Sequence, residues 1–384
     1  MGYGVGSRVL GFFIVFLLAR NLSIDNFAWW QIGKAAATYI LILMEAGFFF
    51  HIALLIQRDQ FSIRSVRSQN YLHRMEIALF AIPFFFIYLH FTSVPLWYAL
   101  FFLPFFAISV LDYDGVAVAA NKSVETGQAR LLKNGLTLFV IASIGLFDDL
   151  AITPIIASTI GAAGSAILLH RVVSKCKNLY QGKDYSRSLF ASLSASRHFL
   201  AMQVAQTSMQ IAGLMIAGIF LATNEVAHYG VALMMAELAI FPTYTIQRVI
   251  QGRYIKRPNA SLAFKLCITT TSATIALHFL HYEFFAPLYT LLFPKFDQKL
   301  LHSVVNVLLL YVTIRTINTY LQLHMNSTER GKLVSTATAI GAATNISGNL
   351  ALIPNIGLTA VPWITVVSEI VILLCLVSRI KKRG

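Results

Sequence analysis

The chain has 384 residues, of which 57% are hydrophobic and only 12% are charged. A soluble domain carries roughly a quarter charged residues, so this chain has about half the charge that a soluble surface needs. With a mean hydropathy of +0.69, this composition excludes a soluble enzyme, a disordered scaffold and a secreted disulfide-rich mini-protein. It predicts an all-α polytopic membrane protein.

Apolar stretches long enough to cross about 30 Å of hydrocarbon as helices recur along the whole chain. They predict about twelve transmembrane helices, in two sets of six. The first set is expected near Gly2–Leu18, Phe27–Phe50, Met75–Phe91, Pro95–Ala119, Leu131–Leu146 and Ile152–Val172. The second set is expected near Phe199–Ala222, Val226–Ile250, Ser261–His281, Leu300–His324, Leu333–Ile353 and Leu358–Val377.

Basic residues alternate between the connections. Of the 30 Lys and Arg residues, 24 fall in one alternating set of loops, from Arg58 to Arg383, and three fall in the opposite set. The positive-inside rule places the basic loops in the cytoplasm, so both termini are expected there. The net charge of +14 is therefore explained by topology and by contact with anionic membrane lipids, and no nucleic-acid partner is expected.

The longest predicted cytoplasmic loop, Arg171–His198, falls near the middle of the chain. It separates six helices from six, and paired six-helix halves are common among transporters. The sequence therefore predicts a six-helix bundle over residues 1–185 and a second over residues 186–384.

Motifs of soluble enzyme chemistry are absent. There is no G-x-x-x-x-G-K-[ST] phosphate loop, no G-x-S-x-G and no H-E-x-x-H, and no cofactor or metal is expected. Asp112-Tyr113-Asp114 spells the D-x-D of glycosyltransferases, but it lies within a predicted span. His278 and His281 are interpreted as membrane-boundary residues. The three cysteines fit no zinc or disulfide pattern. An enzyme is disfavoured.

Eight ionisable residues fall within the predicted spans. Each costs roughly 2.5–3.5 kcal/mol near the bilayer centre when unrelieved, so these side chains must face a wet cavity, pair with one another or lie near a helix end. They are Arg8, Lys34, Glu45, Asp112, Asp114, Glu237, Arg315 and Glu369.

A polar stripe on the seventh predicted span, formed by Gln203, Gln206 and Gln210, also needs water or polar partners. Together the polar groups predict an interior path lined from both halves. Four carboxylates, Asp112, Asp114, Glu237 and Glu369, are candidates for ion coupling. Arg315 has two fates open to it: a pair with an acid such as Glu237 or Glu369, or a cavity position that meets an anionic cargo. The polar residues near it favour the cavity.

The C-terminal helix pair carries the most specific pattern. Asn345 and Asn349 precede Leu350-Ala-Leu-Ile-Pro-Asn-Ile-Gly357, and Ser368-Glu369 follow in the next span. This pattern resembles the closing helices of the Wzx polysaccharide flippases of the MOP exporter superfamily. Further similarities to that family span the chain: Ala19–Leu22, Glu45–Gly47, Val226–Tyr229 and Leu292-Phe293.

The resemblance implies two six-helix bundles around a central cavity in the bacterial inner membrane. It implies a cargo of oligosaccharide linked to undecaprenyl diphosphate, moved to the periplasmic leaflet for O-antigen or capsule assembly. A polysaccharide polymerase and a chain-length regulator are the protein partners expected. A diphosphate would suit Arg8, Lys34 or Arg315, and glycans would hydrogen-bond to Gln203, Gln206 and Gln210.

Two other functions remain open. A multidrug or cation antiporter of the same superfamily is the first, because carboxylates outnumber bases five to three among the eight charges. A membrane-bound polysaccharide polymerase is the second, although the short outer loops leave little room for catalytic groups.

Overall fold

The structure is a computed structural model that describes residues 2–57, 61–144, 150–176, 183–256, 259–281, 286–328 and 330–380. Within these ranges the chain is helical, and its only extended pairing is an isolated bridge between Phe61 and Lys183. The basic residues Arg58, Lys177, Arg257, Lys381, Lys382 and Arg383, used above to orient the chain, lie outside the described residues.

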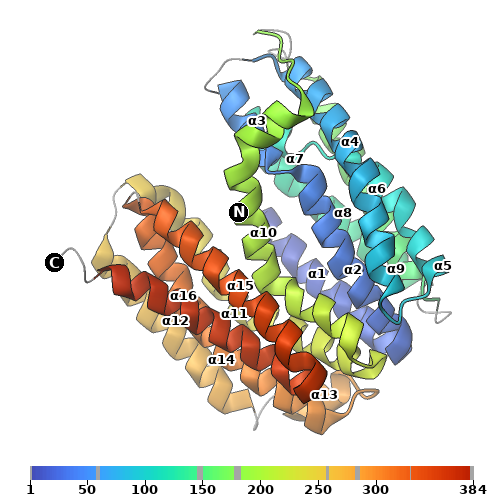
Figure 1. Cartoon of the computed structure of the whole chain (residues 1–384), viewed down its shortest axis with the longest axis vertical. Coiled ribbons are helices and arrows are strands. Elements are labelled where there is room, and N and C mark those ends of the chain that lie inside the picture. The colour runs from blue at the N-terminus through green and yellow to red at the C-terminus, as the bar shows by residue number, and fades with distance from the viewer. Residues whose placement is uncertain are drawn as a thin grey trace. The chain divides into compact units, whose positions relative to one another are not determined.

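Figure 1 shows the order of the helices along the chain. The first are α1 (Gly2–Asn21), α2 (Ile24–Glu45), α3 (Phe48–Gln57), α4 (Ile63–His90), α5 (Leu96–Leu100), α6 (Phe102–Val110), α7 (Asp114–Ala119), α8 (Ser123–Ile144) and α9 (Thr153–Ser174). They are followed by α10 (Leu189–Phe220), α11 (Thr223–Lys256), α12 (Ala260–Leu280), α13 (Ala286–Leu292), α14 (Gln298–Ser327), α15 (Gly331–Ile356) and α16 (Ala360–Ile380).

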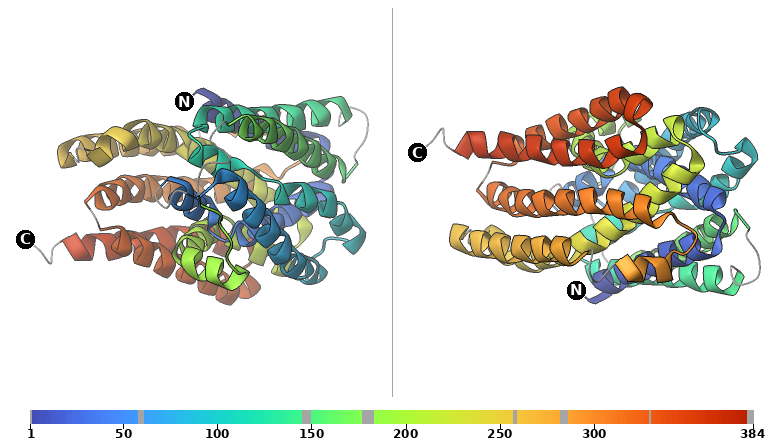
Figure 2. Two further views of the ribbon diagram at one scale, coloured as in Figure 1. Left: turned by 90° about the horizontal axis from the view of Figure 1, so that it is seen from above. Right: turned by 90° about the horizontal axis from the view of Figure 1, so that it is seen from below.

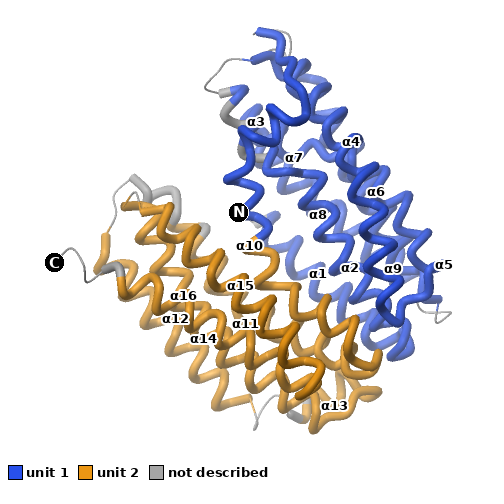
Figure 3. The backbone as a smooth tube through the Cα atoms, in the orientation of Figure 1, with its two compact units in different colours: residues 1–204 blue, residues 205–384 orange. Residues whose placement is uncertain are grey.

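The chain divides into two compact units, residues 1–204 and residues 205–384 (Figure 3). Helix α10 begins in the first unit and ends in the second. The bundle boundary expected after residue 185 stays a prediction.

Within the described residues, nine stretches are long and apolar enough to cross a membrane, and the last of them, Gly331–Ser378, contains both α15 and α16. The expectation of an all-α polytopic membrane protein is confirmed, whereas the count of twelve spans stays a prediction. Three helices begin well before the apolar pattern indicates, α4 at Ile63, α8 at Ser123 and α10 at Leu189. Their extra turns are rich in polar residues.

A break between α2 and α3 positions the end of α2. Ala46 and Gly47 both have positive φ, 47° and 73°, and a left-handed conformation costs a residue with a side chain roughly 1–2 kcal/mol. A Cβ on Gly47 would lie 2.7 Å from the Leu200 backbone nitrogen in α10. Glycine therefore permits both the bend and the close approach of α10, which leaves Glu45 at the last turn of α2.

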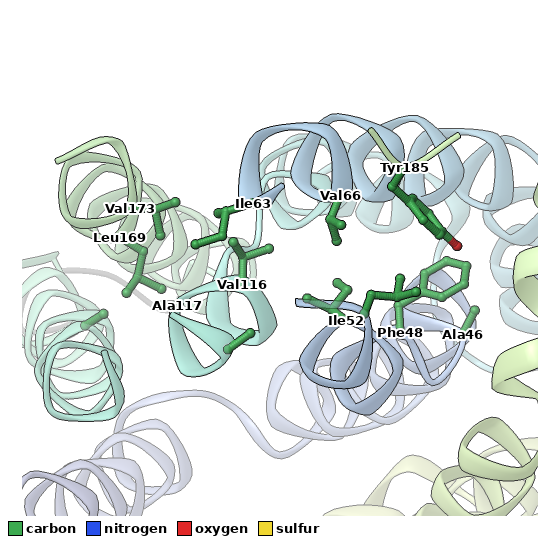
Figure 4. Packing of buried hydrophobic residues seen from close by; sticks show 13 residues of the cluster. Ala46, Phe48, Ile52, Ile63, Val66, Val116, Ala117, Leu169, Val173 and Tyr185 are labelled. Carbon is green, nitrogen blue, oxygen red and sulfur yellow. The ribbon is translucent and has the colours of Figure 1, made fainter. Parts of the chain in front are cut away.

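Beyond this break, the core of the first unit is built from α3, α4, α7 and α9. Phe48, Ile52, Val66, Val116 and Leu169 pack together there with eight further buried residues (Figure 4). The core therefore holds α7 against its neighbours even though the helix is only six residues long.

Helices α8 and α9 cross closely at Gly161. A Cβ there would collide with the Thr137 hydroxyl and would lie 2.5 Å from the Lys133 carbonyl oxygen. We expect Gly161→Ala to lower the free energy of unfolding by about 1–3 kcal/mol, measured as a lower thermal midpoint of the purified protein. The matched control is Gly4→Ala in α1, where a Cβ has no neighbour within 4 Å. An unchanged midpoint for Gly161→Ala would show that α8 and α9 separate without cost.

The second unit is organised around α14, which packs against α11, α12, α15 and α16. Figure 2 shows α12, α14 and α16 side by side. The N-terminus of α14 is capped by Asp297, whose Oδ1 accepts the Leu300 amide at 3.0 Å. This hydrogen bond holds the pKa of Asp297 below its usual value, so the cap stays ionised at neutral pH. Because four helices pack against α14, a side chain in the middle of this helix is surrounded by helices.

Candidate functional site

The first unit contains a polar cavity of about 330 Å³. Three carboxylates and three cations face it, together with hydroxyl and amide groups. Its lining residues are Ser7, Leu41, Glu45, Arg74, Ile108, Ser109, Asp112, Asp114, Arg130, Lys133, Asn134, Ala162, Ser165 and Ala166. They come from α1, α2, α4, the α6–α7 segment, α8 and α9.

One side of the cavity is formed by Arg74 of α4 and Asp112. The Arg74 guanidinium donates to the Asp112 carbonyl oxygen at 3.0 Å and lies 3.7 Å from its carboxylate. The Arg74 side chain is only 7% exposed, so this pair stabilises a charge that has little contact with solvent. The sequence assigned Arg74 to a loop, whereas the structure places it inside α4 and on the cavity.

Asp114, two residues along the chain, takes a different partner. Arg130 donates from Nε and approaches from Nη2, at 2.9 and 2.8 Å from the same Asp114 oxygen. The Asp114 amide donates to Asp112 Oδ1 at 2.9 Å, in the non-helical break that separates α6 from α7. The structure thus brings two of the four predicted coupling residues, Asp112 and Asp114, to one cavity. Each of these carboxylates therefore lies within ion-pair distance of an arginine.

Glu45 lines the same cavity from the end of α2. Its Oε2 accepts a hydrogen bond from Gln203 Nε2 of α10 at 2.8 Å. Gln203, which the sequence analysis predicts to contact glycans, therefore hydrogen-bonds to the Glu45 carboxylate within the first unit.

Helix α8 supplies cavity residues that the sequence analysis did not single out. Arg130, Lys133 and Asn134 lie on one helical face, and Asn134 donates to the Ser7 carbonyl oxygen of α1 at 2.6 Å. Spacings of three and four residues place side chains on one face of a helix. That periodicity is the available signal, but the sequence analysis counts Arg130 and Lys133 among the basic residues of the cytoplasmic loops.

The second unit contains a buried ion pair. Arg315 Nη1 of α14 lies 3.0 Å from Glu369 Oε1 of α16, and the Glu369 side chain is 0% exposed. Asn318 donates to the other Glu369 oxygen at 2.7 Å, and Arg315 Nε donates to the Tyr244 hydroxyl at 3.1 Å. Of the two fates open to Arg315, the structure shows the pair with Glu369; its contact with cargo stays a prediction.

The remaining predicted residues are spread over both units. Lys34 is exposed on α2, with its ammonium 4.8 Å from the Trp30 ring centroid. Arg8 is half-buried in α1. Gln206, Gln210 and Glu237 are exposed on α10 and α11.

His281, directly after α12, hydrogen-bonds within the second unit. His281 contacts the Tyr289 hydroxyl at 3.1 Å and His302 at 3.3 Å. Across the described ranges, no group of three His, Cys, Asp or Glu side chains is arranged to hold a metal ion.

No protein-family model matches this chain, and no curated protein matches its sequence. Solved structures do match. The lipid II flippase MurJ, in an inward closed conformation, aligns with a TM-score of 0.74 and 14% identity, covering 99% of this chain and 87% of the flippase. An inward-facing multidrug resistance MATE family transporter of the MOP superfamily aligns with a TM-score of 0.73 and 13% identity, covering 98% and 96%.

A MOP superfamily transporter from Pyrococcus furiosus, described for the reversed polarity of its binding pocket, aligns with a TM-score of 0.58 and 11% identity over 99% and 93% of the two chains. This chain shares the fold of these three proteins. At these identities the likeness concerns the fold alone.

Proposed function

We propose that this chain is a transporter of the bacterial inner membrane that moves an oligosaccharide linked to undecaprenyl diphosphate from the cytoplasmic to the periplasmic leaflet. The product would be used for surface polysaccharide assembly, together with a polysaccharide polymerase and a chain-length regulator.

The observation that carries the proposal is the fold, which this chain shares with a lipid II flippase over 99% of its length. That neighbour is named for a lipid-borne cargo. The Wzx-like sequence pattern, from Ala19–Leu22 to Ser368-Glu369, adds the oligosaccharide and the polyprenyl diphosphate.

The side chains divide into two roles under this proposal. Lys34, Gln206 and Gln210 are exposed on helices and contact the cargo, with Arg8 and Arg315 as further candidates for its diphosphate. Asp112 and Asp114 share one cavity with Arg74 and Arg130 and carry ion coupling, with Glu237 and Glu369 as further candidates. Their pairing with arginines favours coupling because protonating a carboxylate would release its cation.

A multidrug or cation antiporter is the second candidate function. The MATE family transporter aligns almost as well as the flippase, with TM-scores of 0.73 and 0.74. A cationic drug would favour unpaired carboxylates, whereas both aspartates of the first-unit cavity are paired with arginines. A polymerase has no such support.

Deletion of the gene tests the proposal. We expect lipid-linked repeat units to accumulate on the cytoplasmic face and surface polysaccharide to be lost, measured by lipid extraction and surface staining. Restoration by the plasmid-borne gene is the control. Unchanged surface polysaccharide with increased drug sensitivity would contradict the flippase and favour the antiporter.

A further inference from the structure

The cavity of the first unit has its acceptors matched by protein donors. Asp112 Oδ1 accepts from the Asp114 amide at 2.9 Å, with the Arg74 guanidinium 3.7 Å from the other Asp112 oxygen. Asp114 accepts from the guanidinium of Arg130. Glu45 accepts from the Gln203 amide. Each carboxylate that faces the cavity therefore already has a donor from the chain.

The donors of the same cavity are not all matched. Arg74 is only 6% exposed, and its buried Nε–H has no hydrogen-bond partner. Lys133 makes no ion pair with any residue in the described ranges, and its ammonium lies 5.9 Å from the Phe105 ring centroid. A buried donor without a partner costs roughly 1–3 kcal/mol, so an acceptor from outside the chain would relieve it.

We propose that this cavity binds an oxyanion of the phosphate class through Arg74, Lys133 and Arg130. The Nε–H of Arg74, which has no partner in the chain, would donate to an oxygen of such an anion. Arg130 and the Lys133 ammonium add positive charge beside it. The site lies within one unit and stands whatever cargo the transporter moves.

The size and charge of the cavity suit this ligand. Its 330 Å³ corresponds to about eleven waters at about 30 Å³ each, which leaves room for a tetrahedral anion with part of its hydration. Three carboxylates balance three cations: Glu45 on α2, Arg74 on α4, Asp112 and Asp114 around the α7 start, and Arg130 and Lys133 on α8. Helices α1 and α9 contribute only uncharged lining residues, so the charges of the cavity sum to zero when both aspartates are ionised. We expect proton uptake on Asp112 or Asp114 to offset the negative charge of a bound anion.

Calorimetry on the purified full-length protein tests the site, with sodium sulfate as the probe and gluconate keeping the ionic strength constant. The charge of sulfate does not change near neutral pH, so any pH dependence belongs to the protein. We expect saturable binding that tightens as the pH falls. Lys133→Gln should weaken it about ten-fold or more, the range for a hydrogen bond to a charged group.

The matched control is Lys122→Gln, immediately before the same helix, because Lys122 pairs with Glu125 and does not line the cavity. It should bind sulfate like the parent protein, and Lys133→Arg should retain most of the affinity. Absence of saturable binding, or equal affinity in Lys133→Gln, would overturn the proposal, and the cavity would then hold water alone.

Two further probes distinguish the source of the anion. Inorganic phosphate that competes with sulfate while glycerol phosphate does not would identify a free anion as ligand. Competition by both would identify a phosphoester, such as the head group of a lipid. These titrations measure binding and not transport, so a failed flippase test would leave their outcome unaffected.

Discussion

Replacing Arg315 by alanine is expected to lower the free energy of unfolding by about 3–5 kcal/mol, because it leaves a buried carboxylate without its cation. Glu369 is 0% exposed, and Arg315 is the only cation within 4 Å of it among the described residues. The variant should accumulate poorly in the membrane and, where it can be purified, show a lower thermal midpoint. Arg330→Ala is the control, since the Arg330 side chain makes no ion pair with the described part of the chain.

A double variant separates stability from cargo binding. Arg315→Met with Glu369→Gln removes both charges and keeps an acceptor for Asn318, whose Nδ2 donates to Glu369 Oε2 at 2.7 Å. Replacing both members of a buried pair is often neutral, so accumulation should recover. Transport by the recovered double variant would show that Arg315 is structural. Normal accumulation of Arg315→Ala without transport would instead contradict the stability argument and favour contact with the cargo.

The positions of the spans could be read from the sequence because lipid imposes long apolar stretches. Their ends could not be read as well, because helix continues past the apolar segment wherever polar side chains find partners. Arg74 shows this: the apolar stretch begins at Met75, yet the helix begins at Ile63, and Arg74 turns toward Asp112. A basic residue near a predicted helix end is ambiguous between topology and function.

The pairing of the charged residues could not be predicted from the sequence, for a second reason. Asp112 and Asp114 are two residues apart, yet one pairs with α4 and the other with α8. The sequence offered Glu237 and Glu369 equally to Arg315, and both α11 and α16 pack against α14. Glu369 is buried against Arg315, whereas Glu237 is exposed. Such choices depend on which helices are neighbours and on which faces they turn toward each other, and a single sequence with loose periodicity does not specify this.

Asp114→Asn is expected to reduce transport about ten-fold or more while leaving accumulation in the membrane close to normal. Asparagine cannot take up a proton, so a coupling step that depends on releasing Arg130 would be lost, and so would the response of transport to ionophores. The Arg130 side chain is half exposed, so the unpaired guanidinium retains water and the stability cost stays small. Transport of labelled lipid-linked substrate into vesicles, with and without an ionophore, measures both effects.

Glu125→Gln provides the matched control, because Glu125 lies on the same helix as Arg130 but outside the cavity. A hydrogen bond from its own backbone amide, and then Lys122, hold the pKa of Glu125 below its usual value. It is therefore ionised throughout the physiological range and carries no proton. Its replacement should leave transport and the ionophore response unchanged. Equal transport by Asp114→Asn and Glu125→Gln would rule out proton carriage by Asp114, and Arg130–Asp114 would then be a structural pair.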